Sequence, residues 1–151
     1  MHDPEEIARA FLIESDVDYR VTQLLRGTEF HSRTIAFAQQ TVEKLVKACL
    51  ALRGVVTLDH NLSSLFRALY QADVPEMDEL VRHIDILERH GARPRFPLFQ
   101  RRDLPLWVPS RDYREEDAIR ALHSAEYVVQ RLRPHLDRIL ARPMGEGRTR
   151  P

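Results

Sequence analysis

The 151-residue sequence has a single cysteine, Cys49, and this scarcity excludes an internal disulfide and any zinc site built from cysteines. It has no run of about 18 apolar residues, so no segment is predicted to span a membrane. Its 23 basic and 23 acidic residues cancel, which excludes a histone-like polycation and an acidic disordered protein. The first six residues lack the basic-then-apolar order of a signal peptide, so we expect a cytoplasmic protein.

Glycine is also scarce, and three of the five glycines, Gly27, Gly54 and Gly91, stand where helical patterns stop. Hydrophobic residues make up 43% of the chain, enough for one domain of this length to bury a core. Most of them recur at intervals of three and four. We predict an all-α fold, an up-and-down antiparallel bundle of four to five helices. Residues 1–141 form this single domain, and the polar residues 142–151 are predicted to be a disordered tail.

The helix boundaries are predicted from capping residues. The first helix is expected from about Pro4 to Arg26, and Gly54 is expected to end the second. Pro134 is predicted to kink or break the last long helix. The residues predicted to cap or open the helices are, in chain order, Asp3, Thr28, Asp59 or Asn61, Pro75, and Ser110 or Asp112.

A long loop before the last helix is the most unusual segment of the sequence. Helical periodicity vanishes from residue 92 to residue 111, where four prolines forbid a long helix. Seven arginines and two aspartates give residues 89–114 a net charge of +5, and the remainder of the chain carries −5. Aromatic residues are interleaved with the arginines, a combination suited to phosphate contact and base stacking. Alternatively, the aromatics pack onto the bundle and the arginines are merely solvated.

Four segments, in order along the chain, resemble the HEPN superfamily (higher eukaryotes and prokaryotes nucleotide-binding). Residues 37–48 (FAQQTVEKLVKA) are similar to its "aQQavEKalKa" helix, and residues 59–62 (DHNL) to its "tHdL" turn. Residues 92–97 (ARPRFP) are similar to its "aRYp" element, and residues 116–122 (EDAIRAL) to its last helix. None of the four is specific alone; together they span most of the chain.

The resemblance implies a helical bundle that is often dimeric. Many members are encoded beside a small nucleotidyltransferase and act as the toxin of a pair. It also implies, for active members, a metal-independent ribonuclease whose motif is an arginine, four to six residues, and a histidine. Members without the motif bind nucleotides or RNA, or serve as scaffolds. Apolar positions outside a single stripe, Val46 and Val128, also predict a homodimer.

Two pairs have the spacing of the ribonuclease motif, Arg26 with His31 and Arg53 with His60. Random placement of the arginines and histidines gives about three such pairs, so the spacing alone does not establish catalysis. Metal-free RNA cleavage needs a base for the 2′-hydroxyl and a cation for the phosphorane, and we take Arg53 and His60 as the candidate catalytic pair. Alternatively, His60 stabilises the turn before the third helix through a hydrogen bond.

The candidate ligand-binding residues lie mainly in the loop. We expect four arginines to contact phosphate and two aromatic residues to stack a base; Lys44 and Lys47 are a second candidate anion site, unless they form only a solvated helix face. His83 and His90 are too far apart in sequence for a metal pair, so neither a metal nor a cofactor is predicted. The loop candidates are Arg93, Arg95, Arg101, Arg102, Phe96 and Trp107.

Three functions follow from these patterns. The first is a HEPN-like protein that binds nucleotide or RNA, works with a small nucleotidyltransferase partner and need not be catalytic. The second is a metal-independent ribonuclease toxin of a toxin–antitoxin pair. The third is a structural dimerisation module. Salt-dependent RNA binding separates the first two from the third, because phosphate contacts release counterions.

Overall fold

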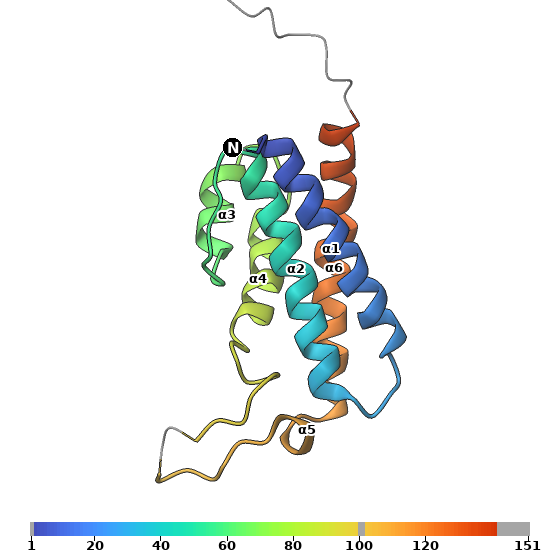
Figure 1. Cartoon of the computed structure of the whole chain (residues 1–151), viewed down its shortest axis with the longest axis vertical. Coiled ribbons are helices and arrows are strands. Elements are labelled where there is room, and N and C mark those ends of the chain that lie inside the picture. Colours follow the sequence, from blue (N-terminus) through green and yellow to red (C-terminus); the bar gives the residue numbers. More distant parts are fainter. Residues whose placement is uncertain (1, 100–101, 142–151) are drawn as a thin grey trace, which may run out of the picture.

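The computed structural model describes residues 2–99 and 102–141, and every regular element within them is a helix. Three long helices lie side by side, two shorter ones pack beside α2, and a long arm leaves the bundle before the last helix (Figure 1). The all-α prediction is therefore confirmed. The helices are α1 (Pro4–Leu24), α2 (His31–Leu52), α3 (Ser63–Tyr70), α4 (Met77–Glu88), α5 (Pro109–Asp112) and α6 (Glu115–Leu140). The predicted disordered tail, residues 142–151, lies outside the described residues.

Helix α2 is the centre of the bundle, in contact with every other helix. Its small and β-branched side chains let its neighbours approach closely, and Ile35, Val46 and Cys49 are fully buried. Val46 and Val128 were the apolar positions that suggested a homodimer. Both are completely buried within the described chain, so they belong to the core and offer no surface for a second copy.

The first helix begins as its sequence predicts, but later caps differ. Asp3 accepts a hydrogen bond from the amide of Glu5 in a capping box. The prediction that Thr28 caps α2 is wrong: α2 begins at His31 after Phe30, and the Thr28 hydroxyl donates to the carbonyl of Leu25 instead.

The predicted caps of the third, fourth and last helices are also wrong. Leu62 precedes α3, and its amide donates to the Glu88 carboxylate of α4 at 2.6 Å, so a tertiary contact replaces the local cap. The first residue of α4 is Met77, two residues after Pro75. The residue before α6 is Arg114. The two predicted caps, Ser110 and Asp112, lie earlier in the chain, within the short helix α5.

Gly54 ends α2 as expected. Its φ of 76° lies in the left-handed region, which costs glycine little. The amides of Gly54 and Val55 donate to the carbonyls of Ala51 and Leu50, which is a Schellman arrangement. Pro134 does not break α6, which continues from Glu115 to Leu140, so that part of the expectation is wrong.

The long loop has more structure than its composition predicts. Leu98 and Trp107 form an antiparallel bridge through two backbone hydrogen bonds of 3.1 and 3.2 Å. Residues 92–99 and 102–108, called the arm from here on, therefore lie against each other, and Figure 1 shows the arm projecting from the end of the bundle near α5. The bridge and a hydrogen bond from Trp107 Nε1 to the carbonyl of Arg93 bring the two sides of the arm together.

Candidate functional site

The root of the arm is held by a cluster of aromatic and basic side chains. The guanidinium carbon of Arg93 lies 4.2 Å from the centroid of the Trp107 ring, and Trp107 Nε1 donates to the Arg93 carbonyl at 2.9 Å. The rings of Trp107 and buried Tyr113 form a T-shaped pair with centroids 4.9 Å apart, and the Tyr113 hydroxyl lies 2.8 Å from His90 Nδ1. Trp107 is therefore a half-buried anchor with Arg93 on one face, and that face is not open to a base.

Beyond this root, the arm exposes the residue types expected of a nucleic-acid contact. Arg93, Arg95 and Arg102 are exposed, and the Phe96 side chain is 57% exposed. The Arg95 guanidinium lies 5.7 Å from the Phe96 ring centroid. Arg101, the fourth candidate phosphate contact, lies outside the described residues.

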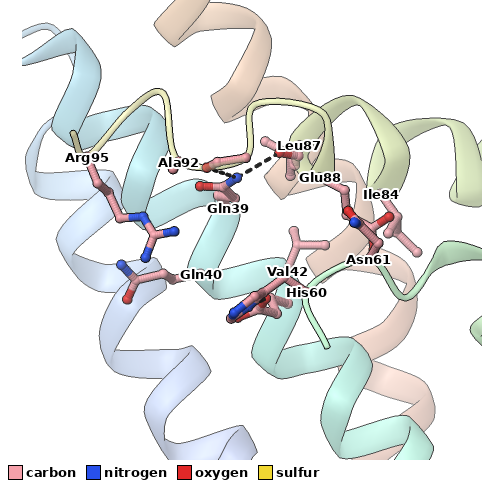
Figure 2. Close-up of a pocket in the computed structure, with 12 residues that line it drawn as sticks. Gln39, Gln40, Val42, His60, Asn61, Ile84, Leu87, Glu88, Ala92 and Arg95 are labelled. Atoms are coloured by element: carbon pink, nitrogen blue, oxygen red, sulfur yellow. Dashed lines mark hydrogen bonds and ion pairs between the residues drawn. The ribbon is translucent and has the colours of Figure 1, made fainter. Parts of the chain in front are cut away.

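A cavity of about 290 Å³ opens where the arm leaves the bundle. Its walls come from the middle of α2, the turn before α3, the end of α4 and the start of the arm (Figure 2). Apolar side chains of Val42, Ile84 and Leu87 line part of it. The polar side chains that share it are Gln39, Gln40, Glu43, His60, Asn61, Glu88 and Arg95.

Gln39 connects α2 to the end of α4. Its Nε2 atom donates to the carbonyl of Leu87 at 3.1 Å and to the carbonyl of Gly91 at 3.0 Å. Both amide hydrogens of Gln39 are used, so its Oε1 atom is fixed as an acceptor beside the cavity (Figure 2).

His60 and two glutamates, Glu43 and Glu88, line the cavity. His60 Nδ1 lies 2.6 Å from Glu43 Oε1, so the His60 ring is fixed by α2 rather than by its own turn. Glu88 is buried enough that its pKa is raised, although the amide of Leu62 donates to it. Sequence reasoning missed Glu43 and Glu88 as site residues, because each looks like an ordinary charged position on a helix.

The structure does not bring Arg53 to His60. Arg53 donates to the carbonyl of Leu69 at 2.9 Å, pairs with Asp73 at 2.7 Å and lies over the ring of Tyr70. These contacts attach the end of α2 to the end of α3. The candidate catalytic pair is thus divided between two different networks.

The two lysines are also separate from the arm. Lys44 Nζ lies 2.5 Å from the Asp18 carboxylate and joins α2 to α1. It lines a shallow apolar hollow with Phe11 and other residues of α1. Lys47 is half-buried on α2, and neither lysine lines the cavity at the root of the arm.

A second cleft, of about 380 Å³, lies between the α1–α2 connection and the start of α6. Arg26, His31 and His123 all line it, so the other pair with the ribonuclease spacing shares one cleft with another histidine. Arg26 is held at this cleft by an ion pair with Glu126.

Within residues 2–99 and 102–141, no three histidine, cysteine, aspartate or glutamate side chains gather in a way that would hold a metal ion. Over the same residues, the structure contains no helix with both the length and the apolar character that crossing a membrane requires.

A comparison with protein families identifies the chain. The model of the HEPN domain matches residues 6–135. The chain belongs to the HEPN domain family. Among curated proteins, "Putative toxin MJ1304" of Methanocaldococcus jannaschii is 31% identical over 135 residues, which cover 85% of this chain and 88% of the relative. No solved structure matches the chain.

Three of the four HEPN-like segments of the sequence meet in space. Residues 37–48 supply Gln39, Gln40 and Glu43 to the cavity at the root of the arm. Residues 59–62 supply His60 and Asn61, and residues 92–97 supply Arg95. Three separate segments thus border one cavity of this HEPN domain, whereas residues 116–122 border the second cleft.

Proposed function

We propose that this HEPN-family protein binds nucleotide or RNA through the arm and the cavity at its root, and that it works with a small nucleotidyltransferase partner. The observation that carries the proposal is the position of the positive charge. The net +5 of residues 89–114 lies on the segment that leaves the bundle at the cavity bordered by three HEPN-like segments, and Arg95 of that segment lines the cavity. Binding in this way requires no catalytic step.

The charge distribution favours an anionic ligand. A local excess of arginine creates a positive potential that the zero net charge of the whole chain conceals. The Trp107 ring fixes Arg93 without consuming its donors, because a guanidinium stacked on an aromatic ring keeps its N–H groups at its edge. Exposed Arg95 and Arg102 extend the same surface along the arm.

The main test compares two double variants in binding to single-stranded RNA at two salt concentrations. Arg95→Glu with Arg102→Glu removes two arm arginines and leaves the Arg93–Trp107 anchor in place. Arg20→Glu with Arg138→Glu makes the same charge change at exposed positions on α1 and α6. If each arm arginine contacts one phosphate, the slope of log K against log salt falls by about 1.4 in the arm variant only.

A variant with all four arginines changed, at positions 93, 95, 101 and 102, should abolish salt-sensitive binding. Equal binding by the arm and control variants, or no salt-sensitive binding by the unmodified protein, would show that the arm is a structural element and contradict the proposal.

The partner and the toxin role are proposed from the family. The name of the archaeal relative says that it is a putative toxin, and this supports a role for the present chain as the toxin of a pair. The test is co-expression with the product of a neighbouring nucleotidyltransferase gene. We expect the two proteins to co-purify and the partner to relieve growth inhibition by this chain. Inhibition that the partner does not relieve would contradict the pairing.

The second cleft favours one alternative function, a metal-independent ribonuclease. Arg26 supplies a cation, and His31 and His123 supply two groups able to move protons, all lining one cleft. RNA cleavage in excess chelator that is lost in His31→Ala and kept in His60→Ala would support this alternative. Absence of cleavage by the unmodified protein would exclude it.

A further inference from the structure

The cavity at the root of the arm combines a polar edge with an apolar wall, and its polar atoms have a definite pattern. We infer that it takes the guanine base of a nucleotide, with Glu43 and Gln39 accepting hydrogen bonds from the base and Arg95 contacting the phosphate. This inference rests on the proposed function and deepens it, because it names the base and the atoms that select it.

Gln39 is the first part of the argument. A glutamine amide ordinarily offers either a donor or an acceptor to a ligand. Here both hydrogens on Nε2 are given to the carbonyls of Leu87 and Gly91, so rotating the amide would cost two hydrogen bonds. Gln39 therefore presents its Oε1 atom, an acceptor, to any ligand in the cavity.

Glu43 is the second acceptor. Its Oε1 atom is engaged by His60 Nδ1 at 2.6 Å, which orients the carboxylate and leaves Oε2 as a further acceptor. The Glu43 side chain is 22% exposed, so its hydrogen bonds are partly shielded from water. Two acceptors from neighbouring turns of α2 thus line one side of the cavity.

Among the four bases of RNA, guanine fits such a pair of acceptors. Its N1–H and exocyclic N2–H₂ are adjacent donors on one edge. On the same edge adenine and cytosine place an unprotonated ring nitrogen beside their amino group, and uracil places carbonyl oxygens on both sides of N3–H. Each of these would set an acceptor against Glu43 or Gln39 and leave a partly shielded polar atom unpaired.

The rest of the cavity suits the remainder of a nucleotide. Val42, Ile84 and Leu87 supply an apolar wall for the face of the base. The volume of about 290 Å³ is that of a small ligand site and fits one nucleotide rather than a helix. Figure 2 shows Arg95 pointing from the arm toward Gln40 at the border of the cavity, where its guanidinium can reach a phosphate.

The first experiment measures calorimetric binding of GMP, IMP and AMP to the unmodified protein. IMP differs from GMP only by the missing 2-amino group, so it isolates one predicted hydrogen bond. We expect GMP to bind at least tenfold more tightly than IMP or AMP. Equal affinities would overturn the inference, as would failure of millimolar GMP to bind.

The second experiment uses paired variants whose folding is checked by circular dichroism. Glu43→Gln should weaken the binding of GMP at least tenfold. Glu14→Gln, a change at an exposed position on α1, should leave the binding of GMP unchanged. Arg95→Ala should weaken the binding of GMP and leave the binding of guanosine unchanged, because guanosine has no phosphate. Arg89→Ala, next to the same arm but outside the cavity, should change neither. If Glu43→Gln does not fold, the GMP and IMP comparison alone decides.

The last comparison separates a free nucleotide from a residue of RNA, and separates this inference from the proposed function. Tighter binding of a guanosine-containing tetranucleotide than of its cytidine counterpart supports guanine recognition within RNA, and GMP binding alone supports a free nucleotide. Salt-sensitive RNA binding that ignores base identity would overturn the guanine site and leave the proposed function standing. If neither RNA nor GMP binds, both fail.

Discussion

Arg93 and Trp107 hold each other across the two ends of the arm. The Arg93 guanidinium covers the indole ring with its carbon 4.2 Å from the ring centroid, and the indole Nε1 donates to the Arg93 carbonyl at 2.9 Å. One side-chain contact and one hydrogen bond therefore close the same loop. The arm owes its shape to this pair and to the adjacent bridge between Leu98 and Trp107.

Trp107→Ala should loosen the arm without unfolding the bundle. The ring is half-buried at the edge of the core, so we expect the free energy of unfolding to fall by about 1–2 kcal/mol, less than for a fully buried tryptophan. Binding of RNA should weaken several-fold because Arg93 loses its fixed position. Urea denaturation and RNA titration measure the two effects, and RNA binding equal to that of the unmodified protein would contradict the role given to the anchor.

Arg53→Ala and His60→Ala should separate stability from binding. Arg53 bonds to the Leu69 carbonyl and to Asp73 and lies over Tyr70, so its loss should lower the free energy of unfolding by about 1 kcal/mol and leave ligand binding unchanged. His60 is 73% exposed and orients Glu43. Its loss should therefore weaken the binding of GMP and hardly change the free energy of unfolding. The reverse pattern would restore Arg53 as a site residue.

Tyr70→Phe should destabilise the protein by about 1–2 kcal/mol. The buried Tyr70 hydroxyl donates to the backbone carbonyl of Cys49. This is one of the last four carbonyl groups of α2, and such groups have no hydrogen-bond partner within their own helix. Removing the hydroxyl leaves that carbonyl buried without this donor. Urea denaturation measures the loss, and Tyr19→Phe on the half-exposed part of α1 is the control. Equal effects of the two changes would refute the assignment.

Stability should fall as the pH is lowered from about 7.5 to 5.5, because a histidine buried in its neutral form takes up a proton more readily in the unfolded chain. His83 is buried between α4 and α6, and burial lowers its pKa, with nearby Arg82 acting in the same direction. The stability that neutral His83 contributes is therefore fully present above the pKa of histidine in the unfolded chain, and it is lost as the pH falls below that value. Glu79 faces it, but the pKa of Glu79 is about 2, outside this range.

The pH dependence should become shallower in His83→Gln. It should not vanish, because burial also lowers the pKa of His90 and of His135. His2→Gln, at an exposed position, should leave the dependence unchanged. Denaturation curves at both pH values test this, and an identical slope in His83→Gln would show that His83 does not carry the effect.

The caps show where local reasoning succeeded and where it failed. Asp3 caps α1 through amides within its own turn, so the neighbouring residues were sufficient to predict it. Leu62 cannot cap a helix with its side chain, and the start of α3 is satisfied instead by Glu88, 26 residues later. Such a partner is chosen by the packing of α4 against α3, which the residues around Leu62 do not encode.

The sequence by itself determined the helices, the glycine that ends α2 and the segregation of arginine into the arm, because each depends on residues within a few positions of one another. Only the tertiary structure decided which polar side chains meet. It turned Arg53 toward Asp73 and His60 toward Glu43, and it placed Gln39 between Leu87 and Gly91. The physical reason is that periodicity fixes the face of a helix, whereas the packing of whole helices fixes what that face touches.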